Sequence, residues 1–459
     1  MKRLADAVRL GDFAQVPAIL DARPELVNMH MAENDEHQAL HYAVFGRSPD
    51  MVRLLMRYGA DARKGIYPYR QATTALTIAS ERGYAEIVEI IYEGEEHRRA
   101  APATAKVEEA AESAARSAVV RGDNAWLITH NTEGKLTNRI DDSGGLLTVA
   151  VQHDQMETLK LLLDLGFDPD ERVRVAGLDE VVFSQAMPLW NSAATGKLAM
   201  AELLLQRGAN PNVHVYASGS PVYSAYRRQQ WAMVDLLKRY GGVVDPVTIG
   251  LFHQKELARQ MLADEAEGRL PAGILERENV SENLLRGAAD GGDPEIVQTA
   301  LPGVDWSRED ERWYWILMQA VWAANPECFG LILQRCDPNL RHPGFGRTLL
   351  DDVAALGGQQ TAGASPVLAA MLLEAGAKIN ERDDILKSTP LGWACRWGRN
   401  QLVKFLLERG ADPVEADAEP WATPQAWAEK RGHTDILNIL RSFLRPSGDV
   451  AGNVSSEVL

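Results

Sequence analysis

The residues that could carry chemistry are few and lie far apart. His37 and His41 are four residues apart, with His30 nearby, and this spacing could place two imidazoles on one helical face as metal ligands. No HExxH motif and no third ligand at fixed spacing accompany them, so we interpret His41 as structural. The neighbouring acids Asp351-Asp352 and Asp383-Asp384 could serve general acid or base catalysis, but we interpret them as solvated turn residues.

The motifs that bind phosphates or activate nucleophiles are missing from the sequence. It contains no GxxxxGK[ST] loop, no GxGxxG after a strand and no GxSxG turn. The three cysteines, Cys328, Cys336 and Cys395, have no CxxC spacing, and Cys395 is expected to be a small core residue. We therefore predict no catalytic residue, no cofactor and no metal.

Composition and charge describe a soluble globular chain of 459 residues. The net charge of −16 would repel nucleic acid and anionic lipid unless the basic residues gather on one face. No apolar run approaches the roughly 18 residues of a membrane span, and Asp6 and Asp12 interrupt the basic N-terminus. We expect a cytoplasmic protein with no membrane and no nucleic acid partner.

One sequence pattern recurs along the chain and would position all of these residues. Residues 388–413 read STPLGWACRWGRNQLVKFLLERGADP, and residues 187–212 read MPLWNSAATGKLAMAELLLQRGANPN. Each copy has a small turn, an alanine-rich helix, a glycine and a leucine-rich helix closed by a second glycine. These closing glycines, at Gly59 and Gly94 or Gly376 and Gly410, recur about every 33 residues.

This pattern resembles the ankyrin repeat. The resemblance implies an all-α fold, an α-solenoid of helix-turn-helix repeats with β-turn or hairpin tips, and we expect about 13 repeats in one curved superhelix. Thr389 and Pro390 fit a helix start, and Gly410 fits a left-handed helix end. The family's turn histidine is retained only at His41, which makes the outer hairpins less regular than in a consensus array.

The spacing of the copies predicts five segments. They are N-terminal repeats with a cap (1–95), central repeats (96–245), divergent repeats (246–346), C-terminal repeats with a cap (347–445) and a disordered tail (446–459).

In the ankyrin family, residues at the end of the first helix of each repeat face a concave groove that contacts partners. Trp and Arg are enriched at binding hot spots, and eight of the 11 tryptophans lie between 306 and 427. We expect Trp313, Trp393 and Trp427 to fill the interior instead. The predicted partner-binding residues are Phe45, Arg82, Arg227, Arg228, Trp315, Trp322, Arg396, Trp397, Lys430 and Arg431.

The sequence therefore favours a monomeric, non-catalytic scaffold that binds another protein or peptide in its groove. A basic groove would also steer an acidic partner segment. Two alternatives stay open: a regulatory or catalytic subunit with a site in the divergent repeats, and nucleic-acid binding through a basic groove that overcomes the overall negative charge.

Overall fold

The structure of the chain is a computed structural model. It describes residues 2–28, 37–66, 70, 72–100, 105–136, 138, 140, 144–174, 181–184, 187–213, 219–270, 279–343, 346–356, 364–384 and 386–444. The predicted tail and His30, the histidine near His37 and His41, lie outside the described residues.

The chain divides into two compact units. Unit 1 joins the two ends of the sequence, Met1–Ala101 and Trp306–Leu459, and unit 2 is the middle, Pro102–Asp305. The five predicted segments stay a prediction. They were defined by how well each stretch matches the repeat pattern, whereas the two units are defined by contacts in space.

Unit 1 is built from helices at both ends of the sequence. They are α1 (Lys2–Arg9), α2 (Gln15–Ala22), the 3₁₀ helix η1 (Pro24–Val27), α3 (Ala39–Phe45), α4 (Pro49–Arg57), α5 (Ala75–Glu81), α6 (Ala85–Ala100), α19 (Arg312–Trp322), α20 (Pro326–Leu333), α21 (Leu349–Ala355), α22 (Ala364–Glu374), α23 (Pro390–Arg396), α24 (Asn400–Glu408), α25 (Pro424–Arg431) and α26 (Thr434–Leu444).

Unit 2 contains further helix pairs and one short hairpin. Its elements are α7 (Ala105–Arg121), α8 (Asn124–Thr132), α9 (Leu146–Gln152), α10 (Met156–Asp164), β1 (Arg172–Arg174), β2 (Val181–Ser184), α11 (Met187–Thr195), α12 (Leu198–Gln206), α13 (Pro221–Arg227), α14 (Trp231–Arg239), α15 (Pro246–Leu251), α16 (Lys255–Ala266), α17 (Val280–Gly291), α18 (Pro294–Ala300) and the 3₁₀ helix η3 (Leu301–Gly303). The strands β1 and β2 pair antiparallel, with Val173 opposite Phe183.

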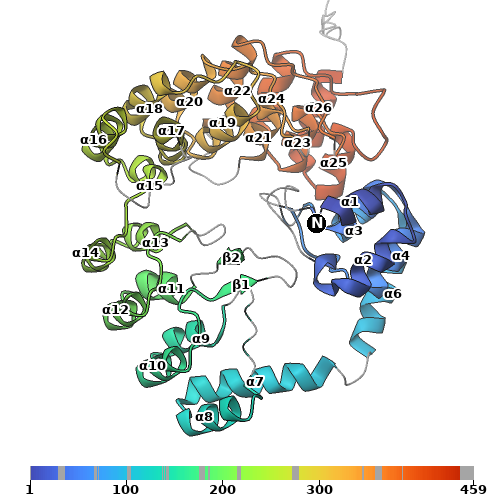
Figure 1. Cartoon of the computed structure of the whole chain (residues 1–459). Coiled ribbons are helices and arrows are strands. Elements are labelled where there is room, and N and C mark those ends of the chain that lie inside the picture. The colour runs from blue at the N-terminus through green and yellow to red at the C-terminus, as the bar shows by residue number, and fades with distance from the viewer. Residues whose placement is uncertain are drawn as a thin grey trace, which may run out of the picture. The chain divides into compact units, whose positions relative to one another are not determined.

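Successive helices pack as antiparallel pairs, and the pairs stack in two layers (Figure 1). In unit 2, α9, α11 and α13 pack in one layer and α10, α12 and α14 in the other. In unit 1, α19, α21, α23 and α25 form one layer and α20, α22, α24 and α26 the second. The all-α repeat fold is thus confirmed, whereas the count of 13 ankyrin repeats and the single superhelix stay predictions.

Short-range signals in the sequence set the helix boundaries. The Thr389 hydroxyl accepts the backbone N–H of Gly392 and Pro390 is the first residue of α23, as expected for a helix start. Gly410 has a φ of 93°, which favours a residue without Cβ after α24. The apolar face of Val403, Leu406 and Leu407 is buried between layers.

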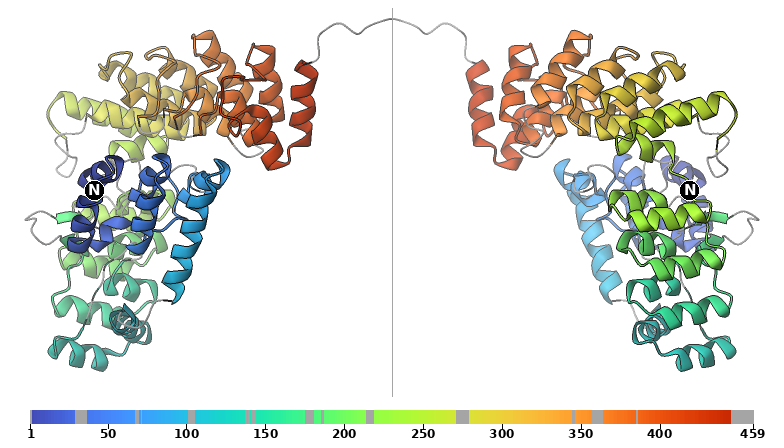
Figure 2. Two further views of the ribbon diagram at one scale, coloured as in Figure 1. Left: turned by 90° about the vertical axis from the view of Figure 1, so that its right-hand side faces the viewer. Right: turned by 90° about the vertical axis from the view of Figure 1, so that its left-hand side faces the viewer.

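The expected end of one second helix was wrong. Gly94, one of the predicted closing glycines, does not end α6, which continues to Ala100 (Figure 2, light blue). A Cβ on Gly94 would come within 2.8 Å of the Met56 side chain, so this glycine allows close packing of α6 against α4. The Glu, Arg and Ala residues that follow are strong helix formers.

The divergent stretch after residue 246 also folds as helix pairs. Its helices α15 and α17 approach each other through glycines. A Cβ on Gly287 would lie 2.1 Å from the carbonyl oxygen of Val247, and one on Gly250 would lie 2.5 Å from that of Leu284. Backbone therefore packs on backbone at this contact, which a search for alanine-rich and leucine-rich helices does not detect.

No helix within the described residues is both long and apolar enough to cross a membrane.

Candidate functional site

Six of the ten predicted partner-binding residues converge within unit 1. Phe45 ends α3, Arg82 follows α5, Arg396 and Trp397 end α23, and Lys430 and Arg431 end α25. These positions at the ends of first helices belong to repeats near both ends of the sequence. They meet around Glu81, the last residue of α5.

Glu81 binds the cations of two C-terminal repeats. Its Oε2 accepts a hydrogen bond from Nη1 of Arg396 at 2.7 Å, and its Oε1 accepts one from Nη2 of Arg431 at 2.7 Å. Lys430 Nζ donates to the Glu81 carbonyl oxygen. One glutamate thus connects α5 to α23 and α25, although 315 residues separate it from Arg396.

Aromatic rings surround these cations. The Arg396 guanidinium lies 4.4 Å from the centre of the Trp427 ring, and Lys430 Nζ lies 5.1 Å from the same ring. The Arg82 guanidinium lies 5.2 Å from the Trp421 ring and 5.4 Å from the Phe45 ring. Cation–π attraction of roughly 0.5–2 kcal/mol per pair supports this arrangement.

We call this cluster the Glu81 junction. It comprises Glu81, the cations Arg82, Arg396, Lys430 and Arg431, and the rings of Phe45, Trp397, Trp421 and Trp427.

Exposure differs sharply across the Glu81 junction. Arg396 is only 2% exposed, which contradicts our expectation of an exposed hot spot, because Glu81 covers its guanidinium. Lys430 and Arg431 are exposed, whereas Arg82 and Trp397 are half-buried. Trp427 is buried, as expected. The surface available to a partner therefore begins at Lys430 and Arg431.

Positive charge exceeds negative charge in the Glu81 junction. Burial lowers the pKa of Arg396, and the carboxylate of Glu81 opposes that effect. Burial also lowers the pKa of Lys430, and repulsion from Arg396 and Arg431 adds to it. Within the described part of the chain, Nε and Nη2 of Arg82 and of Arg396 are buried without a hydrogen-bond partner. These guanidinium groups retain unused donors.

Burial lowers the pKa of Arg82 as it does that of Arg396, and a second carboxylate, Asp383, opposes this effect at both arginines through space. Its oxygens are used elsewhere: Oδ2 accepts from Nε1 of Trp393 at 3.0 Å, and Oδ1 accepts the backbone N–H of Leu386 at 2.6 Å. Asp383 is fixed within the C-terminal repeats, so Glu81 is the carboxylate that binds the junction cations directly.

The other four predicted residues lie elsewhere. Arg227 and Arg228 are exposed at the end of α13 in unit 2, where Arg228 lies over the Trp190 ring. Trp315 and Trp322 are half-buried on α19 in unit 1, and the Trp315 ring lies 4.7 Å from the ring of His342. Trp313 and Trp393 are buried, as expected.

Glu81 and Trp421 were not among the site residues predicted from the sequence. Glu81 directly precedes Arg82 and shares its position at the end of a first helix, so a search of that position for both charge signs would have included it. Trp421 precedes α25 in a turn, outside the positions that the resemblance marks.

Three of the four adjacent acids are not solvated, contrary to our expectation. Asp351, Asp352 and Asp383 are buried, and only Asp384 is exposed. The carboxylate of Asp351 accepts the backbone N–H of Thr348 at 2.7 Å, which completes a capping box at the start of α21. Asp352 accepts the Tyr314 hydroxyl. The buried acids therefore stabilise the start of a helix and contacts with neighbouring side chains.

His41 has the structural role expected of it. Its Nδ1 accepts the backbone N–H of Gln38 at 3.1 Å, so Nε2 carries the hydrogen and lies 3.0 Å from the Thr73 carbonyl oxygen of the next repeat. Both ring nitrogens are therefore used in connecting turns. Cys395, also as expected, is buried in the core.

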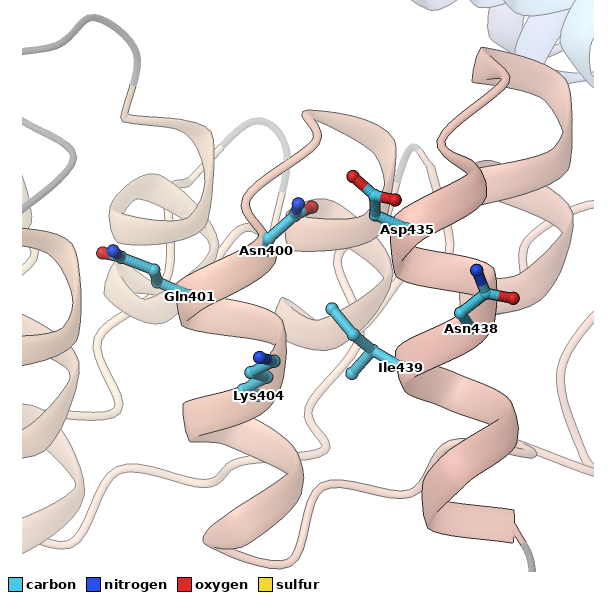
Figure 3. Close-up of a pocket in the computed structure, with 6 residues that line it drawn as sticks. All are labelled: Asn400, Gln401, Lys404, Asp435, Asn438 and Ile439. Atoms are coloured by element: carbon cyan, nitrogen blue, oxygen red, sulfur yellow. The ribbon is translucent and has the colours of Figure 1, made fainter.

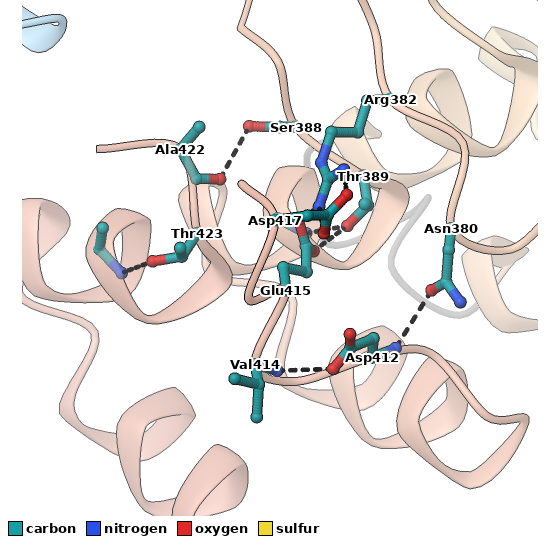
Figure 4. A network of polar contacts seen from close by, with 12 residues as sticks. Asn380, Arg382, Ser388, Thr389, Asp412, Val414, Glu415, Asp417, Ala422 and Thr423 are labelled. Atoms are coloured by element: carbon teal, nitrogen blue, oxygen red, sulfur yellow. Dashed lines mark hydrogen bonds and ion pairs between the residues drawn. The ribbon is translucent and has the colours of Figure 1, made fainter. Parts of the chain in front are cut away.

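Glutamates connect turns where the family's histidine is absent. Glu171 accepts backbone N–H groups at the start of α9, and its Oε2 accepts the Thr148 hydroxyl at 2.7 Å. Glu415 accepts the Thr389 hydroxyl at 2.6 Å and Nη2 of Arg382 at 3.1 Å (Figure 4). Both glutamates are buried. The turns therefore stay ordered by a different residue type.

An open depression lies between α24 and α26 on the second helix layer (Figure 3). It is lined by Asn400, Gln401, Lys404, Asp435, Asn438 and Ile439. These side chains show no convergence on a common point, and the predicted groove residues are not among them.

Comparisons with known proteins match the repeat pattern. A family model described as ankyrin repeats (3 copies) matches residues 4–100 and 317–417, and both ranges lie in unit 1. The B-cell lymphoma 3 protein homolog of Mus musculus is 29% identical over 217 residues. That alignment covers 47% of this chain and 38% of the relative. Residues 4–100 and 317–417 are thus similar to ankyrin repeats, and they fold as paired helices.

Proposed function

We propose that this chain is a non-catalytic adaptor that binds another protein or peptide at the Glu81 junction. The observation that carries the proposal is the convergence of six predicted partner-binding positions on one cluster rich in Arg and Trp. Ankyrin repeats are generally protein interaction modules, and the match to them supports a protein partner.

Rigid presentation is the proposed binding mechanism. Stacked helices hold the side chains at the ends of α23 and α25, so little conformational entropy is lost when a partner binds. Exposed Lys430 and Arg431 make the first contacts, and the half-buried Trp397 and Trp421 rings beside them supply apolar area. A modest area of contact with the partner can then give useful affinity for it.

Neither alternative has an observation of this kind in its favour. Arg227 and Arg228 lie in unit 2 and Arg396, Lys430 and Arg431 in unit 1, and Arg396 and Arg431 already bind Glu81. In the divergent stretch, the described helices α15 and α17 pack closely through Gly250 and Gly287, and α16 packs against both. We also propose a monomeric, cytoplasmic protein; the low number of cysteines, three in 459 residues, supports a reducing compartment.

A pull-down from native cell extract tests the proposal. The bait is the full chain, and the variant is Lys430→Ala with Arg431→Ala, because these side chains are exposed and can be removed without opening the core. Arg396 is unsuitable because it is buried. A partner retained by wild type should be lost from the variant.

The matched control is Arg441→Ala, which removes an exposed arginine from α26, outside the Glu81 junction. It should retain every partner, and circular dichroism should show that both variants keep wild-type helicity. Identical sets of retained proteins for wild type and the double variant would refute binding at this site.

A further inference from the structure

We propose that Glu81 is an internal placeholder for an acidic segment of the partner. The carboxylates of that segment would take the position of the Glu81 carboxylate on Arg396 and Arg431, so partner binding and the internal contact exclude each other. This inference rests on the proposed function. It adds that the partner is acidic and that Glu81 controls access of the partner to Arg396.

The first argument is the geometry of the bound carboxylate. Each oxygen of Glu81 accepts one arginine N–H at 2.7 Å, from Arg396 on α23 and from Arg431 on α25. Two arginines from adjacent repeats thus form a receptor for one carboxylate. Its present occupant comes from α5, a distant part of the sequence, as a segment of another protein would.

The second argument is the excess of donors. Glu81 uses Nη1 of Arg396, whereas Nε and Nη2 of Arg396 and the same atoms of Arg82 are buried without hydrogen-bond partners among the described residues. Leaving a buried donor unsatisfied costs about 1–3 kcal/mol. A segment with several carboxylates can satisfy donors that a single glutamate cannot.

The third argument is the order of exposure. The side chain of Arg431 is 40% exposed. The side chain of Arg396 is 1% exposed and lies behind that of Glu81, which is 14% exposed. An approaching acidic segment therefore meets Arg431 and Lys430 first. The segment reaches Arg396 only when the Glu81 side chain moves away. Glu81 therefore lowers the affinity for the partner, and only a sufficiently acidic segment replaces it.

Binding of a defined acidic probe to the full chain tests this inference. The probe is a fluorescein-labelled peptide of eight glutamates, followed by fluorescence anisotropy, and a peptide of eight glutamines controls for charge. Glu81→Gln keeps the side-chain volume and removes the competing charge. We expect it to bind the probe about tenfold more tightly than wild type, which corresponds to about 1.4 kcal/mol.

Two variants serve as controls. Glu86→Gln removes an exposed charge from the next helix and should bind as wild type does. Glu81→Gln combined with Arg431→Ala should lose most of the gained affinity. Hydrogen exchange gives a second readout: the probe should speed exchange of α5 in wild type, because it displaces Glu81 from its two arginines.

The outcomes separate the inference from the proposed function. Equal or weaker probe binding by Glu81→Gln, or no probe binding by any variant, overturns the placeholder inference. If the pull-down still shows a partner lost with Lys430 and Arg431, the adaptor function stands without it. If the probe binds as expected and that pull-down shows no such loss, the acidic site stands and the proposed adaptor role fails.

Discussion

At the scale of single residues, burial decides how titratable side chains behave. Burial raises the pKa of Asp351 well above its ordinary range, and the charges of Asp383 and Asp352 act in the same direction, whereas hydrogen bonds from Thr348 oppose them. The folded chain therefore holds a proton that the unfolded chain releases above about pH 4.

The first prediction concerns Asp351→Asn. Because the folded pKa is raised, the stabilising effect of the protonated form is complete below the ordinary pKa and is lost as pH rises through the folded pKa, by at most about 1.4 kcal/mol per pH unit. The Asn variant should lack this slope in urea unfolding measured from acid to neutral pH. Asp384→Asn, an exposed control, should keep it, and parallel curves for all three proteins would contradict the prediction.

The second prediction concerns the thiols. Cys328, Cys336 and Cys395 are buried, and burial raises the pKa of Cys336 to about 12 and that of Cys395 still further. Because the thiolate is the nucleophile, a thiol-specific disulfide reagent should label the native chain slowly at neutral pH and all three cysteines after denaturation. Rapid labelling of the folded chain would show that a cysteine is accessible.

At the scale of elements, two glycines inside helices differ in what an added Cβ would meet. A Cβ on Gly287 in α17 would meet backbone atoms of α15, the nearest at 2.1 Å, whereas one on Gly330 in α20 would meet only the terminal methyl of Met371, at 2.8 Å. Backbone cannot move aside without shifting a helix. A flexible methionine can.

The third prediction uses this contrast. Gly287→Ala should lower the free energy of unfolding by about 1–3 kcal/mol through overpacking. Gly330→Ala, its matched control, should leave it unchanged or raise it by up to about 1 kcal/mol, because alanine favours helix. Urea midpoints measure both. A stabilised Gly287→Ala would show that α15 and α17 pack less closely than described.

The same scale shows what could be predicted from the sequence. Helix starts such as Thr389-Pro390 and ends such as Gly410 depend on neighbouring residues, so local pattern was sufficient. The prediction that Gly94 ends a helix was wrong because this glycine instead allows close packing against Met56 on another helix. The buried Glu415 replaces a histidine of the family from a different position in the repeat, which pattern matching does not reveal.

At the scale of the whole molecule, the candidate site was predicted only in part, for a physical reason. The ends of the first helices were marked correctly, so Arg82, Arg396 and Lys430 appeared as candidates. That Arg396 would be buried depends on Glu81, which lies 315 residues away, and no local pattern encodes such a contact. Unit 1 is discontinuous in sequence, and the contacts of the Glu81 junction are among those that join its two segments.

The fourth prediction follows from this discontinuity. In a repeat array whose members contact only sequence neighbours, substitutions in α5 and α23 should add independently. Because Glu81 and Arg396 form an ion pair that is mostly buried, a double-mutant cycle with Glu81→Gln and Arg396→Gln should give a coupling energy of about 0.5–3 kcal/mol in urea unfolding. The same cycle with exposed Glu86→Gln in place of Glu81→Gln should be additive. Additivity in both cycles would mean that the Glu81–Arg396 ion pair does not stabilise the fold, whereas coupling in the first cycle alone would show that this ion pair helps the two ends of the chain to stabilise each other.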